Sequence, residues 1–251
     1  MFFFFKKKKI VVDCFTADAT VYNLWFPEPA VNYFPDWWKT LDPYTEIVTK
    51  VGLQKIGTIK KCNGFIDLYK TGFILPLWSE LVIKTDNLGQ IFHEFSDPTH
   101  TAETHPQTQY NTREFDKYIH LKLLSPWLFK EKTGVQFSWT EPIWNNISKL
   151  TEKHILPANV NYKYQHGTNV NILFPRRDKQ IRLNAGDPLV HILPLTEHEI
   201  EIKTHLVTGE ELHKLGWTSQ PSSFTNKYRV NKKRIDELEK RKGKCPFGFG
   251  K

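Results

Sequence analysis

The chain has 251 residues, enough to bury a substantial hydrophobic core, and its aromatic content of 14% suits β-strands. Its three cysteines, Cys14, Cys62 and Cys245, lie far apart in the sequence. This spacing excludes a disulfide framework and supplies no paired ligands for a structural zinc ion, so we expect no metal. No apolar run is long enough to cross a bilayer, and Phe2–Phe5 precede Lys6–Lys9, the reverse of a secretory signal. We therefore expect an intracellular protein.

The net charge of +8 is concentrated at the two ends of the chain. Lys6–Lys9 carry +4 and Asn226–Lys251 carry +7, which leaves −3 for the rest. We therefore predict three regions: a basic N-terminal tail over residues 1–9, a mainly β domain over 10–206, and a helical, basic extension over 207–251. Basic tails of this kind are usually solvated, although they can also contact phosphate groups.

The first quarter of the chain mixes short apolar runs with proline. Ile10–Val12 is a candidate strand, and Asp36–Lys39 can form one helical turn after a proline. We interpret the aromatic residues of 21–44 as a cover packed over the core, with an aromatic-lined ligand groove as the alternative. Residues 45–61 show too little periodicity to predict an element. Phe65–Lys84 is expected to resume β structure, with a turn at Thr71-Gly72.

A hairpin and a long loop follow. Asp86–Gly89 is a typical hairpin turn, and Ile91–Phe95 forms the returning strand. Ser96–Thr112 is polar and rich in Thr, so it is predicted to be an exposed loop of the kind that often carries function. It contains His100 and His105, which we interpret as solvated rather than as metal ligands.

The second half alternates between apolar and polar residues with period two, as half-buried antiparallel strands do. We expect strands at Tyr118–Leu124 and Val135–Trp139, and a short helical piece at Pro142–Leu150. The clearest run is Asn159–Leu195, which is expected to form consecutive strands separated by turns. Thr208 and Glu211 have the spacing of a helix capping box.

We find no sequence motif for catalysis. There is no nucleophile elbow, no phosphate-binding loop and no dinucleotide fingerprint. Four residues could line a ligand site at the mouth of a barrel, namely His120, His166 and His191 on proposed strands, and Asp187 at a strand end. Each of these histidines is more often a hydrogen-bonded wall residue than a ligand, and Asp187 fits a turn. The residue pattern therefore favours a protein without catalytic activity.

Several runs together carry a resemblance to a known family: NGFIDLYKTGFILPLWSELVIKT (63–85), YIHLKLLSPWLFKEKTGVQFSW (118–139), YKYQHGTNVNILFP (162–175), AGDPLVHILPLTEHEIEIK (185–203) and KCPFG (244–248). The chain resembles an uncharacterised family of tailed-bacteriophage proteins of the cyanophage type. The resemblance implies a viral protein made in the host bacterial cytoplasm, which could also be part of the virion. It supplies no activity, no cofactor and no catalytic residues.

A second, weaker similarity is to β-clip folds of the dUTPase type. The turn Ala185–Pro188 before a hydrophobic strand is similar to one in that family, and Ser125-Pro126-Trp127 stands near the place of its phosphate-binding segment. Trp127 therefore joins the candidate ligand-binding residues. The arginine, the paired serines and the uridine-binding hairpin of that family are missing, so the similarity concerns architecture alone.

We therefore predict a mainly β fold, an antiparallel β-sandwich or distorted barrel of β-clip or jelly-roll type, with short helices and a C-terminal basic helix. The expected function is that of a non-catalytic accessory or structural phage protein acting through its surfaces, with other viral proteins as partners and no membrane. The alternative is a metal- or nucleotide-dependent enzyme, or a small-ligand binder, on a β-clip or cupin-like barrel.

The C-terminal segment has two interpretations. Its apolar side, Ile235 and Leu238, can dock on the β domain or on a partner, and this packing role is favoured. Alternatively, its basic side chains can bind nucleic acid weakly and without sequence preference. The residues concerned are Lys232, Lys233, Arg234, Arg241 and Lys242.

Overall fold

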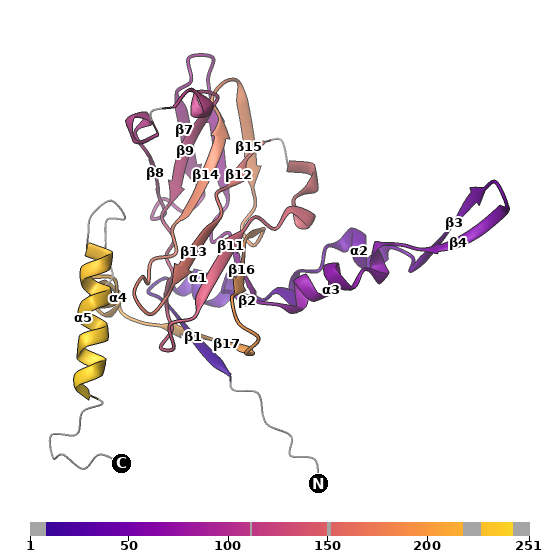
Figure 1. The fold of residues 1–251 in the computed structure, drawn as a ribbon. Helices are drawn as coiled ribbons and strands as arrows, with labels where there is room; N and C mark the ends of the chain where they lie inside the picture. The colour runs from indigo at the N-terminus through magenta and orange to yellow at the C-terminus, as the bar shows by residue number, and fades with distance from the viewer. Residues whose placement is uncertain (1–8, 111, 150–151, 218–226, 243–251) are drawn as a thin grey trace, which may run out of the picture.

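The structure, a computed structural model, describes residues 9–110, 112–149, 152–217 and 227–242 (Figure 1). It is mainly β, with several antiparallel sheets and few, short helices, which confirms the predicted fold class. Within these residues no sheet closes on itself, so the architecture is sandwich-like rather than a barrel.

Three antiparallel sheets form most of the body. The largest has the order β13-β11-β16-β5-β2, with strands Ala158–Asn161, Gln136–Thr140, Pro188–Pro194, Phe73–Pro76 and Glu28–Pro29. The second has the order β12-β14-β9-β8, with strands His154–Ile155, Val170–Pro175, Tyr118–Leu123 and Ala102–Thr104. The third has the order β15-β6-β7, with strands Lys179–Leu183, Leu81–Thr85 and Ile91–Phe95.

A fourth sheet joins the two ends of the β domain. Its order is β10-β1-β17, with strands Leu128–Lys130, Ile10–Thr16 and Ile200–Leu206. The β1–β17 pair is parallel, unlike the other strand pairs of the described residues. Both strands lie at the foot of the body in Figure 1.

The helices are short and lie outside the sheets. The α-helices are α1 (Ala19–Leu24), α2 (Asp36–Thr40), α3 (Asn63–Lys70), α4 (Gly209–Trp217) and α5 (Lys227–Lys242). The 3-10 turns are η1 (Ala30–Tyr33), η2 (Ile59–Lys61), η3 (Gln107–Gln109), η4 (Arg113–Phe115), η5 (Ile143–Asn145) and η6 (Ile147–Lys149). A separate hairpin consists of β3 (Tyr44–Thr49) and β4 (Gly52–Gly57).

One hydrophobic core is shared by strands of all four sheets of the body. Its centre is aromatic: the ring of Phe73 lies 5.8 Å from Phe129 and 6.2 Å from Phe137, and Tyr162 packs against both of these rings. The Trp139 indole N–H donates to the buried Tyr162 hydroxyl over 2.7 Å. Aromatic burial contributes large area, and this bond satisfies the polar atoms that accompany it.

Several predicted elements are confirmed. The helical turn after Pro35 is α2, and Asp86–Gly89 joins β6 to β7. The capping box of α4 is formed, because Glu211 N–H donates to the Thr208 hydroxyl and the Glu211 carboxylate accepts from Thr208 N–H.

The β structure predicted at Phe65–Lys70 is wrong, since these residues belong to α3. Phe65 and Tyr69 stand one helical turn apart and are both buried, so a helix places both rings on the inner side. The chain returns to β structure at Phe73, directly after Gly72, whose φ of +73° permits the tight turn before β5.

The strand expected to run through His166 also ends earlier, at Asn161. The Asn161 carboxamide accepts from Lys163 N–H and donates to Gly134 O, which favours a turn over an extended strand. Tyr162, Tyr164 and His166 are nevertheless all buried, as the period-two pattern implied.

Candidate functional site

The three candidate histidines come from three different places in the fold. His120 lies on β9, His191 on β16 and His166 in the turn that follows β13. His191 Nε2 donates to Thr71 O over 2.9 Å, and His166 Nδ1 donates to Leu215 O over 3.3 Å. Burial lowers the pKa of both His166 and His191, so both rings are held neutral as wall residues.

The other two candidates occupy structural positions. Asp187 lies in the turn before β16, where its carboxylate accepts from Asn184 N–H over 3.0 Å and its carbonyl accepts from Leu77 N–H. Trp127 is fully buried in the core beside Thr168, whose hydroxyl donates to the Trp127 carbonyl. A ligand-binding role for either residue stays a prediction.

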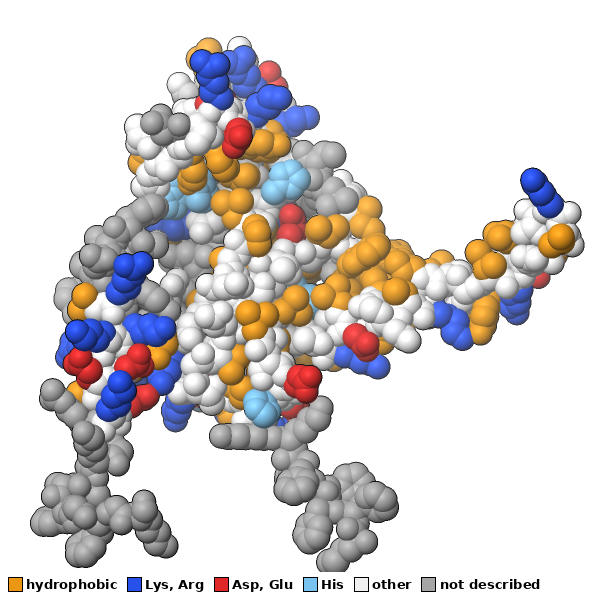
Figure 2. Space-filling model, viewed as in Figure 1, with side chains coloured by type: hydrophobic (Ala, Val, Ile, Leu, Met, Phe, Trp, Pro, Cys, Tyr) orange, Lys and Arg blue, Asp and Glu red, His pale blue; other side chains and the backbone are white. Residues whose placement is uncertain are grey.

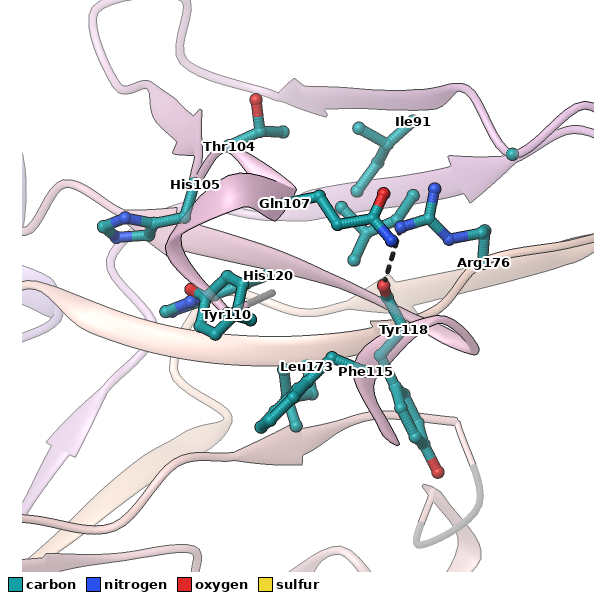
Figure 3. Close-up of a pocket in the computed structure, with 12 residues that line it drawn as sticks. Ile91, Thr104, His105, Gln107, Tyr110, Phe115, Tyr118, His120, Leu173 and Arg176 are labelled. Atoms are coloured by element: carbon teal, nitrogen blue, oxygen red, sulfur yellow. Dashed lines mark hydrogen bonds between the residues drawn. The ribbon is translucent and has the colours of Figure 1, made fainter. Parts of the chain in front are cut away.

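Of these candidates, His120 lines the pocket shown in Figure 3. The pocket has a volume of about 220 Å³ and lies between the β6–β7 hairpin, the segment after β8, β9 and the end of β14. Its walls include His105, Tyr110, Phe115 and Arg176, none of which the sequence singled out for this purpose. Two of these side chains, His105 and Tyr110, come from the Thr-rich segment 96–112, which was predicted to be an exposed loop of the kind that often carries function.

The His120 ring has no hydrogen-bond partner within the described chain. Both ring nitrogens are buried and unpaired, and the His105 ring stacks on it at 4.2 Å between centroids. Burial lowers the pKa of His120 to about 4, and the charges of His105 and Lys122 act in the same direction. Asn171 opposes this shift, but its Oδ1 makes no hydrogen bond of normal geometry to the ring. The pocket therefore contains a neutral imidazole at physiological pH.

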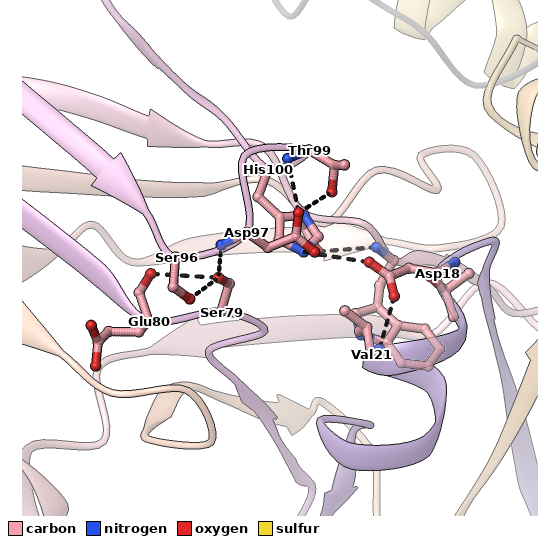
Figure 4. Close-up of polar contacts among 11 residues, drawn as sticks. Asp18, Val21, Ser79, Glu80, Ser96, Asp97, Thr99 and His100 are labelled. Carbon is pink, nitrogen blue, oxygen red and sulfur yellow. Dashed lines mark hydrogen bonds and ion pairs between the residues drawn. The ribbon is translucent and has the colours of Figure 1, made fainter.

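A second polar cluster joins the segment after β1 to the segment after β7 (Figure 4). His100 Nε2 lies 3.4 Å from Asp18 Oδ2 and 3.8 Å from Asp97 Oδ2. Each carboxylate uses its other oxygen for local backbone, Asp18 accepting from Val21 N–H and Asp97 from Thr99 N–H. The three ligand atoms are close enough to one another to share a divalent cation. His100 also lies between the two carboxylates, so the cluster connects the two loops.

The most exposed apolar surface is on the β3–β4 hairpin, which we call the arm (residues 44–57). It projects from the body in Figure 1, and every β4 residue and most of β3 are exposed. Val48, Val51 and Leu53 have exposed fractions of 85%, 83% and 65%. The sequence missed this element, although Tyr44–Thr49 is rich in β-branched residues.

Aromatic side chains hold the base of the arm to the body. Phe65 packs against Trp37, Trp38 and Trp144 with ring centroids 5.3–5.8 Å apart, and Trp37 Nε1 donates to Trp144 O. Figure 2 shows hydrophobic side chains gathered where the arm meets the body. The exposed members of this base patch are Val31, Trp37, Ile143, Trp144 and Ile147. The aromatic segment is thus partly a cover, as predicted, and partly an open apolar surface.

Helix α5 contacts the body through polar groups, and the predicted docking of its apolar side stays a prediction. Tyr164 donates to Asp236 over 2.7 Å, and Lys163 pairs with Glu239 at 2.7 Å. Ile235 is half-buried, whereas Leu238 has an exposed fraction of 46%. The basic residues Lys232, Lys233 and Arg234 are exposed, and the side chains of Arg241 and Lys242 lie outside the described part. Polyanion binding by this helix stays a prediction.

Comparison with known proteins adds no relative, because no family model matches the chain and no curated protein matches its sequence. Among the described helices, none combines the length and the hydropathy that a membrane span requires.

Proposed function

We propose that the chain is a non-catalytic assembly protein that associates with a second copy of itself through the arm. The resemblance to tailed-phage proteins favours an accessory or structural role in a phage. The single observation that carries the proposal is a two-stranded ribbon that exposes apolar side chains on both of its faces.

The register of the arm defines the two faces. Val48 lies opposite Leu53, so their side chains form one apolar pair on the first face. On the second face, Ile47 and Ile56 are diagonal neighbours, because Ile47 pairs with Gln54 and Thr45 pairs with Ile56. A surface hairpin of a monomer normally turns a polar face to water, whereas this arm presents apolar groups on either side.

The arm cannot derive its stability from its own burial. An isolated two-stranded hairpin is at best marginally stable in water, and the arm packs on the body only at its base. Its five aliphatic side chains remain exposed in the single chain, namely Ile47, Val48, Val51, Leu53 and Ile56. A partner that covers Val48, Val51 and Leu53, the most exposed of them, would stabilise each by about 1.5–3 kcal/mol, which is the usual gain for burying such a side chain.

The base patch of the same chain is a suitable partner surface. It is apolar and exposed, and the arm of its own chain points away from it (Figures 1 and 2). Two copies related by a two-fold axis could place the tip of each arm on the base patch of the other. This arrangement would cover both surfaces at once and is self-complementary, as two-fold dimers require.

Sedimentation velocity of the purified protein tests the proposal. We expect the wild type to form a dimer and the variant Val48→Lys/Leu53→Lys to be a monomer at the same concentration. Burial of the two side chains contributes at least about 3 kcal/mol per arm, so the dissociation constant should rise by more than about a hundredfold.

A matched control is available on the β6–β7 hairpin. Leu88 and Phe92 are exposed apolar residues there, so Leu88→Lys/Phe92→Lys adds the same charge at another hairpin and should leave the dimer intact. A wild type that stays monomeric at its highest soluble concentration would contradict the proposal. Equal dissociation in both double variants would also contradict it, since the effect would then reflect charge rather than the arm.

A further inference from the structure

We infer that the pocket beside β9 binds a small aromatic carboxylate. This inference is independent of the assembly role, because the pocket lies among strands of the body and shares no residue with the arm.

The size of the pocket limits the ligand. Its volume of about 220 Å³ lies below the roughly 300–1,000 Å³ of sites for drug-sized molecules. It therefore suits a molecule of about ten non-hydrogen atoms rather than a whole nucleotide.

Arg176 supplies a positive charge at the wall. One terminal nitrogen, Nη2, donates to Tyr118 O over 3.2 Å, as the dashed line in Figure 3 marks. Its Nε is buried, and within the described residues this atom has no hydrogen-bond partner and the guanidinium has no ion-pairing carboxylate. A partly buried cation without a counter-ion costs free energy, and a carboxylate bound in the pocket would supply that counter-ion.

The position of Arg176 is set by the neighbouring hairpin turn. A Cβ on Gly89 would lie only 2.9 Å from Arg176 Cγ, so the glycine allows the side-chain stem to lie against the turn. Gly89 has a φ of +80°, which the turn itself also requires. The guanidinium is therefore held at the wall rather than extended into solvent.

The remaining walls are suited to a flat, apolar ring. The rings of Tyr110 and Phe115 lie 5.1 Å apart, and Tyr110 lies 5.2 Å from the ring of His120. Ile91 and Leu173 add aliphatic surface to the same pocket. Because aromatic rings pack favourably at such distances, the pocket combines a planar apolar wall with one cation. A phosphate monoester would bring a charge of about −1.5 to −2 to this single guanidinium, which makes a carboxylate the better match.

Isothermal titration calorimetry with 4-hydroxybenzoate as the probe tests the inference on the wild-type protein. We expect binding that is at least about tenfold tighter than that of 4-hydroxybenzamide, which has the same ring without the charge. Acetate and inorganic phosphate should bind more weakly than the aromatic acid, since neither has a ring. Equal affinity for the acid and the amide, tighter binding of phosphate, or no binding of the aromatic acid would overturn the inference.

Adjacent arginines provide a matched pair of variants. Arg176→Gln removes the pocket guanidinium, whereas Arg177→Gln removes an equal charge from an exposed side chain one residue away. We expect Arg176→Gln to weaken 4-hydroxybenzoate binding at least about tenfold and Arg177→Gln to leave it unchanged. Equal binding by both variants would place the ligand elsewhere and refute the assignment. If Arg176→Gln does not fold, the affinities of the wild type for the acid and for the amide still test the inference.

Discussion

Replacing His120 with Phe should make the protein less sensitive to acid. The ring of His120 is half-buried, unpaired at both nitrogens and held neutral by burial, which lowers its pKa from the ordinary value of 6.5 to about 4. The unfolded chain therefore binds more protons than the folded chain between these two pH values. The contribution of this site to the free energy of unfolding is fully present above pH 6.5 and is lost as the pH drops towards 4.

The size of the effect follows from the same shift. At about 1.4 kcal/mol per pH unit, a fall from 6.5 to 4 would correspond to about 3 kcal/mol for a fully buried ring. Because solvent screens a half-buried ring, we expect roughly 1–2 kcal/mol. Phe retains the stacking on His105 and removes two buried polar atoms, so the variant should also be no less stable than the wild type at pH 8.

Urea denaturation at a series of pH values between 4 and 8 measures the effect. The free energy of unfolding of the wild type should fall more steeply with decreasing pH than that of His120→Phe. His198→Gln, at an exposed position, is the control for removing a histidine. If the free energies of unfolding of the wild type and His120→Phe change with pH in parallel, the assignment of a neutral, buried His120 is refuted. The wild type keeps some acid sensitivity in any case, because burial also lowers the pKa of His166 and His191.

Three further substitutions test the packing, each by urea denaturation at neutral pH. Lys153→Met removes the partner of Glu141, 2.7 Å away in a buried ion pair. It should lower the free energy of unfolding by about 3–5 kcal/mol because it leaves a buried carboxylate without its counter-ion. Gly72→Ala should cost more than about 2 kcal/mol, since the new Cβ would collide with the Ile192 carbonyl oxygen and φ is positive at this residue. Thr208→Ala removes the capping hydroxyl of α4 and should cost about 1 kcal/mol.

Each of these three predicted stability losses has an outcome that contradicts it. A loss below about 1 kcal/mol for Lys153→Met would mean that Glu141 finds water or another donor. Gly64→Ala serves as the control for Gly72→Ala, because its Cβ would meet nothing within 4 Å and helix α3 should be stabilised. A Thr208→Ala variant as stable as the wild type would mean that the cap contributes nothing to folding.

The strands could be predicted from the sequence wherever one face of a strand is buried. β9 and β14 show strict alternation of buried and half-buried residues. β9 was predicted nearly to its end, and β14 lies in the run Asn159–Leu195 that was predicted to form strands. Helix α3 was missed because its apolar residues fit both a strand and a helix, and only the aromatic cluster at the arm base selects the helix. The arm was missed because it buries almost nothing and so leaves no period-two contrast.

The sites depend on contacts between distant segments, which a single sequence does not reveal. His120 was chosen as a candidate because it stands on a strand, yet its pocket neighbours Tyr110 and Arg176 lie 10 and 56 positions away in the chain. Likewise, Asp18 meets His100 only because the loops after β1 and β7 are folded together. Histidines that the sequence grouped, His166 and His191, are placed in separate environments by the sheets.

The central claim is that the arm binds a second copy of the chain, and amide hydrogen exchange measured as a function of protein concentration tests it most directly. The account predicts that amides of β3 and β4 near Val48 and Leu53 exchange fast in dilute protein and become protected as the concentration rises. Amides of the β6–β7 hairpin should exchange at one rate throughout, since that hairpin belongs to the folded body. Arm amides whose exchange does not depend on concentration would contradict the claim.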